Sequence, residues 1–111
     1  GTQLLCIGGK PGDSVEFEFN QLEDCPYQLV VYATKAPDYG IVSFSVNGQD
    51  THIKWDGYDT KVTLSDPISL GCYSPVRGAL TLKISLSGAN PKAVEEKNLF
   101  GLDAIQLMKK Q

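Results

Sequence analysis

The residues best able to bind a ligand lie in one short turn, Trp55-Asp56-Gly57-Tyr58. Two aromatic side chains flank a carboxylate there. An aromatic ring offers a flat apolar face to a ligand, and a carboxylate accepts hydrogen bonds from a ligand's hydroxyl groups. Tyr39 and Tyr73 also lie in or beside turns, where binding residues concentrate on a rigid scaffold. We therefore take Trp55, Asp56, Tyr58, Tyr39 and Tyr73 as candidate ligand-binding residues.

The aromatic candidates also have a structural interpretation. Trp55 and Tyr58 would cap one end of a hydrophobic core while their polar atoms stay exposed. Tyr39 lies between Asp38 and Gly40, and its hydroxyl would tie down a turn, as tyrosine does at the corner of a β-sandwich. The sequence alone leaves both interpretations open.

Asp103 is the candidate metal ligand. It lies at the start of a predicted strand and shares the alternation of Ile105 and Leu107, which places its carboxylate on the core side or at the rim of the core. One interpretation is a calcium site built with other oxygen donors. The donors considered are Glu16, Glu18 and Asp66. No Asp-x-Asp-x-Asp loop accompanies Asp103, so backbone N–H groups of a loop are the alternative partners of its carboxylate.

Catalytic chemistry has little support in the sequence. The chain has one histidine, His52, which we expect to be exposed. A Ser-His-Asp or Cys-His arrangement and a His/Cys zinc site are therefore disfavoured. Glu95 and Glu96 are adjacent on a polar loop, whereas a glycosidase needs two carboxyl groups roughly 5 to 9.5 Å apart across a cleft. We expect no enzyme activity.

The cysteines predict neither a metal site nor a disulfide framework. There are three, Cys6, Cys25 and Cys72, with no Cys-x-x-Cys spacing. An odd number excludes complete intramolecular pairing but leaves room for one bridge. We expect all three to be small buried apolar side chains, and their disulfide state stays open.

The segment from Ala36 to Gly48 organises the predicted elements. Its first residues favour a turn. Val42, Phe44 and Val46 then alternate with less apolar residues, which predicts a strand with one buried face. Asn47-Gly48 follows, and because both residues tolerate positive φ, this pair predicts a tight hairpin.

The rest of the chain repeats this strand and turn pattern. Alternation or continuous apolar runs predict further strands at 3–7, 14–19, 27–34, 51–55, 58–64, 68–73, 79–86 and 99–107. No segment keeps a helical period. About eight or nine short strands with regular turn signals predict an all-β, antiparallel fold of the sandwich or barrel type. Alternation repeated in several strands favours two packed sheets.

Length and charge set the remaining limits. The 111 residues fit one domain, residues 1–111. The net charge of −3 with scattered basic residues gives no reason to expect nucleic acid. No apolar run approaches the length of a membrane span. The chain begins with Gly1 rather than Met, so we expect a piece excised from a longer protein or a tag-cleaved chain.

Several motifs resemble a known family. They are Pro11-Gly12-Asp13-Ser14-Val15-Glu16-Phe17, Tyr27-Gln28-Leu29-Val30-Val31-Tyr32, Thr34-Lys35-Ala36-Pro37-Asp38-Tyr39-Gly40, Val46-Asn47-Gly48, Trp55-Asp56-Gly57-Tyr58, Ser69-Leu70-Gly71, Leu80-Thr81-Leu82, Ser87-Gly88-Ala89-Asn90-Pro91-Lys92 and Phe100-Gly101-Leu102-Asp103-Ala104-Ile105-Gln106-Leu107. Together they resemble the small jelly-roll modules of the galactose-binding-like, carbohydrate-binding-module group, which are attached to bacterial secreted glycoside hydrolases and to related proteins of unknown function. The chain departs from the pattern in the long loop from Cys72 to Gly78 and at Ala104, where a bulky aromatic residue is expected.

The resemblance implies a function as well as a fold. It implies a jelly-roll β-sandwich that serves as a non-catalytic carbohydrate-binding or accessory module of a glycoside-hydrolase-like protein and binds sugar through loop aromatics. The implied partners are a poly- or oligosaccharide and a catalytic domain of the same precursor. The implied location is extracellular, periplasmic or at the cell surface. A structural calcium is common in this fold group, which raises the interest of Asp103.

A second function fits the same features. The chain would then be a structural accessory sandwich that packs on a catalytic domain and has no ligand of its own. This alternative predicts a contiguous apolar patch on an outer face. Ile41 and Val30, which alternate with the predicted core residues, would contribute to it.

Overall fold

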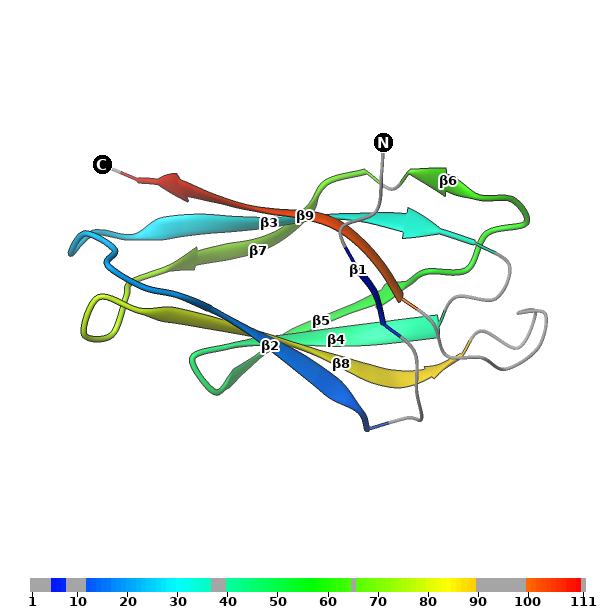
Figure 1. The fold of residues 1–111 in the computed structure, drawn as a ribbon, viewed down its shortest axis with the longest axis horizontal. Helices are drawn as coiled ribbons and strands as arrows, with labels where there is room; N and C mark the ends of the chain where they lie inside the picture. The colour runs from blue at the N-terminus through cyan, green and yellow to red at the C-terminus, as the bar shows by residue number, and fades with distance from the viewer. Residues whose placement is uncertain (1–4, 8–11, 37–39, 65, 90–99, 111) are drawn as a thin grey trace.

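The computed structural model describes residues 5–7, 12–36, 40–64, 66–89 and 100–110, and every regular element in these ranges is a β-strand. The strands form two antiparallel sheets that pack face to face (Figure 1). Sheet A contains β1 (Leu5–Ile7), β9 (Phe100–Lys109), β3 (Tyr27–Lys35), β7 (Ile68–Tyr73) and β6 (Thr63–Leu64). Sheet B contains β2 (Ser14–Phe19), β8 (Leu80–Ala89), β4 (Gly40–Val46) and β5 (Gln49–Asp56). The predicted all-β sandwich is confirmed.

The strand pairing is nested from the middle of the chain outwards. β4 pairs with β5, β3 with β7, β2 with β8, and β1 with β9. The chain is thus one long antiparallel hairpin rolled over itself. The β3–β9 ladder completes sheet A, and the β4–β8 ladder completes sheet B. This connectivity is that of a double-sheet jelly roll.

The hairpin at the centre of the roll forms where the sequence predicts it. Asn47 has a φ of 52° and Gly48 a φ of 79°, as a tight two-residue turn requires. Asn47 also joins the hairpin to β8, because its N–H donates to the carbonyl oxygen of Thr81 at 2.9 Å and its side-chain oxygen accepts from the N–H of Thr81 at 3.0 Å. The same turn chemistry recurs at Arg77-Gly78, where φ is 54° and 77°.

The core lies between the two sheets and follows the predicted alternation. It contains Leu29, Val31 and Ala33 of β3, Val42, Phe44 and Val46 of β4, and Leu80, Leu82, Ile84 and Leu86 of β8. Burial of one such side chain contributes about 1.5 to 3 kcal/mol. The residues between these core positions point to the outer faces of the sheets. A slip of one residue would therefore expose the core side chains, so the register of these strands is fixed. The fixed strands hold the turns at both ends of the sandwich.

The segment predicted as a strand at 58–64 is mostly irregular. Only Thr63–Leu64 is a strand, which pairs with the end of β3. Val62 and Leu64 alternate as a buried strand would, but they are 73% and 63% exposed. Leu64 pairs with Thr34, whose side chain points outward from sheet A, so Leu64 also lies on the outer face, and Val62 precedes the strand.

The prediction that all the cysteines are buried is wrong for Cys72. The β3–β7 ladder skips Leu70 at a bulge, and Gly71 adopts a φ of 100°. This extra residue reverses the alternation, so Leu70 is buried while Cys72 is exposed. Cys25 is half-buried and, like Cys72, is a free thiol. The side chain of Cys6 lies outside the described part of the structure.

Candidate functional site

Trp55 faces the space between the sheets. It lies on β5 directly opposite the buried Val42, so both side chains are on the core side of sheet B. The indole is half-buried and packs against the core. The ammonium of Lys35, at the end of β3, lies over the ring, 5.9 Å from its centroid. Trp55 therefore connects β5 of sheet B with the end of β3 in sheet A.

The next three residues carry the chain from one sheet to the other. The N–H of Gly57 donates to the carbonyl oxygen of Gly40 at 3.0 Å, and its own carbonyl accepts from the N–H of Ala36 at 2.9 Å. A carboxylate oxygen of Asp56 accepts from the N–H of Tyr58 at 2.9 Å. Tyr58 forms an isolated parallel bridge with Ala36. Backbone contacts to both sheets thus hold Asp56 and Tyr58 in place.

The structure brings three of the five candidates together. Trp55, Asp56 and Tyr58 lie at the end of the sandwich where β3 and β5 end and β4 begins (Figure 1). Each of the three side chains is half-buried. Tyr39 lies outside the described residues. This end therefore presents a tyrosine and a carboxylate next to a tryptophan that supports the core.

Tyr73 does not join this cluster. It lies opposite Tyr27, at the other end of β3, and packs against the core. Its hydroxyl donates to the carbonyl oxygen of Leu70 at 2.6 Å. Burial raises the pKa of the Tyr73 hydroxyl, and the charge of an ionised Cys72 adds to that rise. The contact made by the hydroxyl holds the bulge at Leu70 and Gly71 in place.

Asp103 is at a bulge that the alternation of the sequence does not reveal. In the β3–β9 ladder Tyr32 pairs with Ala104 and Ala33 with Leu102, so Asp103 is the extra residue. Leu102 takes the core position, and the prediction that Asp103 shares the face of Ile105 and Leu107 is wrong.

The carboxylate of Asp103 instead binds a neighbouring side chain. Its two oxygens accept from the hydroxyl of Thr34 at 3.2 and 3.0 Å. Thr34 is 6% exposed and lies on the outward side of β3. The contact satisfies a buried hydroxyl, which is a structural role, although the donor is a side chain rather than the backbone N–H groups expected.

The donors considered for a calcium site are not gathered around Asp103. Glu16 and Glu18 are exposed on β2 of sheet B, whereas Asp103 belongs to sheet A. Asp66 is exposed in the connection between β6 and β7. In the described ranges no three His, Cys, Asp or Glu side chains form a group able to hold a metal ion. Calcium binding through Asp103 stays a prediction.

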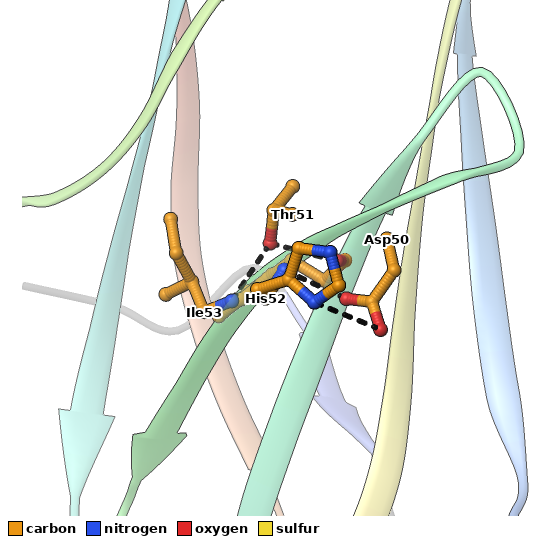
Figure 2. Close-up of polar contacts among 5 residues, drawn as sticks. Asp50, Thr51, His52 and Ile53 are labelled. Atoms are coloured by element: carbon orange, nitrogen blue, oxygen red, sulfur yellow. Dashed lines mark hydrogen bonds and ion pairs between the residues drawn. The ribbon is translucent and has the colours of Figure 1, made fainter.

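A polar bulge on β5 is the feature that the sequence analysis missed. Phe44 on β4 faces three residues on β5, Thr51, His52 and Ile53, and His52 has a φ of 61°. Figure 2 shows the hydrogen bonds that stabilise this bulge. The Thr51 hydroxyl donates to the Phe44 carbonyl oxygen at 2.8 Å and accepts from the N–H of Ile53 at 3.2 Å. Asp50 accepts from the N–H of His52 at 2.8 Å.

The only sequence signal for this bulge is Asp50 two residues before His52, the spacing of an Asx turn. The His52 side chain is 88% exposed, as expected, and its Nδ1 lies 3.9 Å from a carboxylate oxygen of Asp50. These residues shape the edge strand of sheet B.

The outward face of sheet A differs in charge from that of sheet B. On β3 and β9 its described residues from Gln28 to Thr34 and from Ala104 to Met108 are uncharged, and Asp103 is bonded to Thr34. The Tyr32 hydroxyl donates to the side chain of Gln106 at 3.0 Å, and the Gln28 amide donates to Ser69 at 3.3 Å. Sheet B instead exposes Glu16, Glu18 and Lys83.

The apolar patch expected from Val30 and Ile41 does not form. Val30 is only 5% exposed and lies between Ser69 and Gln106 in the two ladders of β3. Ile41 is half-buried and lies on β4 of the other sheet. Among the side chains that the structure describes, the large apolar ones exposed on sheet A are Leu64 and Met108, at 63% and 36%.

The chain is thus a jelly-roll β-sandwich, and its fold is found in a known enzyme. A solved structure of a Paenibacillus xanthan lyase matches 91% of this chain with a TM-score of 0.74 and 24% sequence identity. The match covers 10% of the lyase chain, so the similarity concerns a small part of a much longer protein. At this identity the likeness shows the fold.

The other comparisons give no family. No protein-family model matches the chain, and no curated protein matches it. The described part of the chain has no helix long and apolar enough to cross a membrane.

Proposed function

We propose that this chain is a non-catalytic, carbohydrate-binding accessory module of a carbohydrate-active protein. The similarity to part of a protein named as a xanthan lyase supports an association with polysaccharide. The aligned part is one tenth of that lyase, which supports an accessory role rather than a catalytic one. An extracellular, periplasmic or cell-surface location fits this proposal, because large polysaccharides occur there.

The proposed binding site is the end of the sandwich formed by Trp55, Asp56 and Tyr58. The single observation that supports it is the way Gly57 joins this turn to both sheets, at 3.0 Å from Gly40 and 2.9 Å from Ala36. Such a turn needs no reordering when a ligand binds, and so loses little entropy. In this proposal the ring of Tyr58 supports the sugar ring and Asp56 accepts hydrogen bonds from hydroxyl groups. Trp55 holds the turn in place from the core side.

A glycan array on the isolated chain, with a folded-state check by circular dichroism, tests this function. For any glycan retained, we expect Tyr58→Ala to weaken binding by roughly tenfold, since an aromatic anchor typically contributes about 1 to 2 kcal/mol. Tyr32→Ala, on the outward face of sheet A, is the matched control and should bind as the parent does. Equal loss in both variants would refute the site, and a silent array would refute the function.

Calcium is tested in the same experiment. We propose that Asp103, if it binds calcium, does so in exchange for its contact with Thr34. Binding would then raise the melting temperature of the parent chain, and Asp103→Asn would abolish the rise. An unchanged melting temperature with millimolar calcium or with chelator would leave Asp103 as a structural partner of Thr34.

A second candidate function is supported by the outward face of sheet A. The cores of protein interfaces are depleted of charge and contain tyrosine and methionine. The uncharged surface around Tyr32, Gln106 and Met108 has this composition. The chain would then pack on a catalytic domain of the same precursor and need no ligand. A folded domain that binds nothing on the array would favour this candidate.

A further inference from the structure

The outward face of sheet A is exposed to solvent and nearly free of charge. Figure 1 shows β3, β7 and β9 in the upper layer of the sandwich, so the outer side of these strands points away from sheet B. Among the described residues, Asp103 is the one charged group on this side of β3, β6, β7 and β9, and it is bonded to Thr34. We call this surface the A face. The exposed side chains on it, each paired with an outward residue of β3, are Leu64, Ser69, Cys72, Gln106 and Met108.

The outward face of sheet B, in contrast, carries charges of both signs. Glu16, Glu18, Lys54 and Lys83 are exposed there. The whole chain has a net charge of −3, so two copies repel each other at long range. Like charges placed side by side in an interface also oppose association. Of the two outward faces, the A face is therefore the one through which two copies meet with the least repulsion.

The polar groups of the A face are self-complementary. The Tyr32 hydroxyl donates to Oε1 of Gln106 at 3.0 Å, and Nε2 of Gln28 donates to Ser69 at 3.3 Å. These bonds use the acceptor of Gln106 and a donor of Gln28. Gln106 still has N–H groups to donate, and Gln28 still has a carbonyl oxygen to accept. In a two-fold contact residue i of one copy meets residue j of the other and j meets i, so the bond from Gln106 to Gln28 can form twice.

We propose that the A face binds the A face of a second copy of this chain, which gives a two-fold symmetric dimer. The axis passes between Gln28 and Gln106, which lie on the neighbouring strands β3 and β9. Met108 pairs with Gln28 in the same ladder and is 36% exposed, so the contact covers its apolar side chain together with the ring of Tyr32. The cores of such interfaces contain tyrosine and methionine and few charges.

The size of the A face sets the expected affinity. The nine residues of β3 span roughly 30 Å, and three neighbouring strands are about 14 Å wide, which gives on the order of 400 Å² of flat sheet on each copy. The relief of the side chains adds to this area, but the total stays at the small end of specific interfaces. We therefore expect a reversible dimer with a Kd of roughly 10 to 100 μM.

The dimer does not depend on carbohydrate binding. It would cover the surface that the second candidate function assigns to a catalytic domain, so these two uses of the A face exclude each other. Analytical ultracentrifugation of the isolated chain, under reducing conditions so that no disulfide contributes, separates them. We expect the mass to rise from that of one chain to that of two between about 1 μM and about 1 mM.

Two results of this titration would overturn the proposal. A chain that stays monomeric at the highest concentration would leave the A face to the catalytic domain. Growth beyond two chains would also overturn it, because a two-fold contact closes on itself and cannot extend.

Thiol labelling shows which face the contact covers. Cys72 pairs with Gln28 and is exposed on the A face, whereas Cys25 is half-buried in the loop before β3. At about ten times the Kd roughly one fifth of the chains are monomers, so Cys72 should react with a maleimide about fivefold more slowly than at high dilution. Peptide mass spectrometry resolves the two sites, and Cys25 should keep its rate. Equal slowing at both cysteines, or at neither, would refute the A face as the contact.

A charge exchange at one position tests the symmetry of the dimer. Gln106→Glu keeps an acceptor for Tyr32 but places like charges near each other in a two-fold contact, and should weaken association by roughly tenfold or more. Gln106→Lys should do the same, whereas an equimolar mixture of the two variants should associate again. Ser45→Glu makes the same change in net charge on the outward face of sheet B and should leave the Kd unchanged. Equal weakening by Ser45→Glu, or a mixture that stays monomeric, would refute the proposed dimer.

Discussion

His52 is the one described non-glycine residue with a positive φ that lies within a strand; Gln21, Asn47 and Arg77 lie in turns or bends. A left-handed conformation crowds the Cβ atom against the backbone and costs roughly 1 to 2 kcal/mol. The contacts of Thr51 and Asp50 hold the backbone there. The bulge interrupts the outer edge of sheet B, and an interrupted edge is a poor template for another strand.

We expect His52→Gly to stabilise the fold by about 0.5 to 1 kcal/mol, because glycine removes the strain but loses more entropy on folding. Urea denaturation followed by tryptophan fluorescence measures this change. Lys54→Gly, on the same strand with an ordinary φ, is the control and should destabilise by about 0.5 to 1 kcal/mol. Destabilisation by both variants would show that the bulge is not strained at His52.

Tyr73 should make stability depend on alkaline pH. Burial raises the pKa of its hydroxyl in the folded chain, so its protonated form contributes stability that is fully present below the unfolded pKa near 10 and is lost as the pH rises through the folded pKa. Tyr73→Phe removes this titration and the hydrogen bond to Leu70, at a cost of about 0.5 to 1.5 kcal/mol.

The stability difference between the parent and Tyr73→Phe is therefore expected to be constant up to about pH 9 and to shrink above pH 10. Denaturation curves from pH 7 to pH 11 measure it. A difference that widened above pH 10 would contradict the assigned direction.

At the scale of the elements, β5 and β3 are joined by Trp55. The indole packs against the core opposite Val42, and Lys35 of the other sheet lies over it. The contact therefore spans the two sheets at the end that carries the proposed binding turn. Trp55 thus cannot be removed without loosening the scaffold of that turn.

We expect Trp55→Ala to destabilise the fold by about 2 to 4 kcal/mol, somewhat less than for a fully buried tryptophan. Lys35→Ala should cost no more than about 1 kcal/mol, the usual size of an exposed cation–π contact. Chemical denaturation followed by far-ultraviolet circular dichroism measures both. A Trp55→Ala variant as stable as the parent would favour an exposed binding platform over the core contact.

Strand alternation could be predicted from the sequence, and the bulges could not. Leu80, Leu82, Ile84 and Leu86 are buried as expected because hydrophobic side chains at every second position leave one register for β8. Asp103 was misplaced because one extra residue in β9 reverses the two faces, and no neighbouring glycine marks it. Cys72 was misplaced for the same reason, although Gly71 beside it is a signal that a bulge is near.

The candidate site was predictable only in part. The sequence brings Trp55, Asp56 and Tyr58 together because they are neighbours in the chain. The placement of Tyr73 at the opposite end depends on the direction of β7 in sheet A. That direction follows from the nested pairing of the whole chain, which local patterns do not contain.

At the scale of the whole molecule, the nested pairing makes most contacts distant in sequence. In the described ranges, β4 and β5 are the one pair of consecutive strands that a tight turn joins and that pair directly, while β1 pairs with β9 at the far end of the chain. Closing such loops costs entropy before the contacts form. The order of pairing therefore proceeds most readily from the central hairpin outwards.

We expect folding in milliseconds to seconds, the range of sandwiches dominated by distant contacts. Stopped-flow tryptophan fluorescence measures the rate. Gly48→Ala, which strains the central hairpin at a φ of 79°, should slow folding more than it speeds unfolding if this hairpin forms first. A change confined to the unfolding rate would place the hairpin late in the folding order.

The three-residue pairing of β1 with β9 also determines how the module would respond to a mechanical load. The two strands are antiparallel. The chain enters β1 at Leu5, which lies beside Leu102, and it leaves β9 at Lys109. Both strands therefore extend from the same end of the ladder. Tension on the two ends would therefore peel β1 away one hydrogen bond at a time, instead of shearing the whole ladder at once. Force would detach the first strand before the rest of the roll, which would uncover the β9 edge.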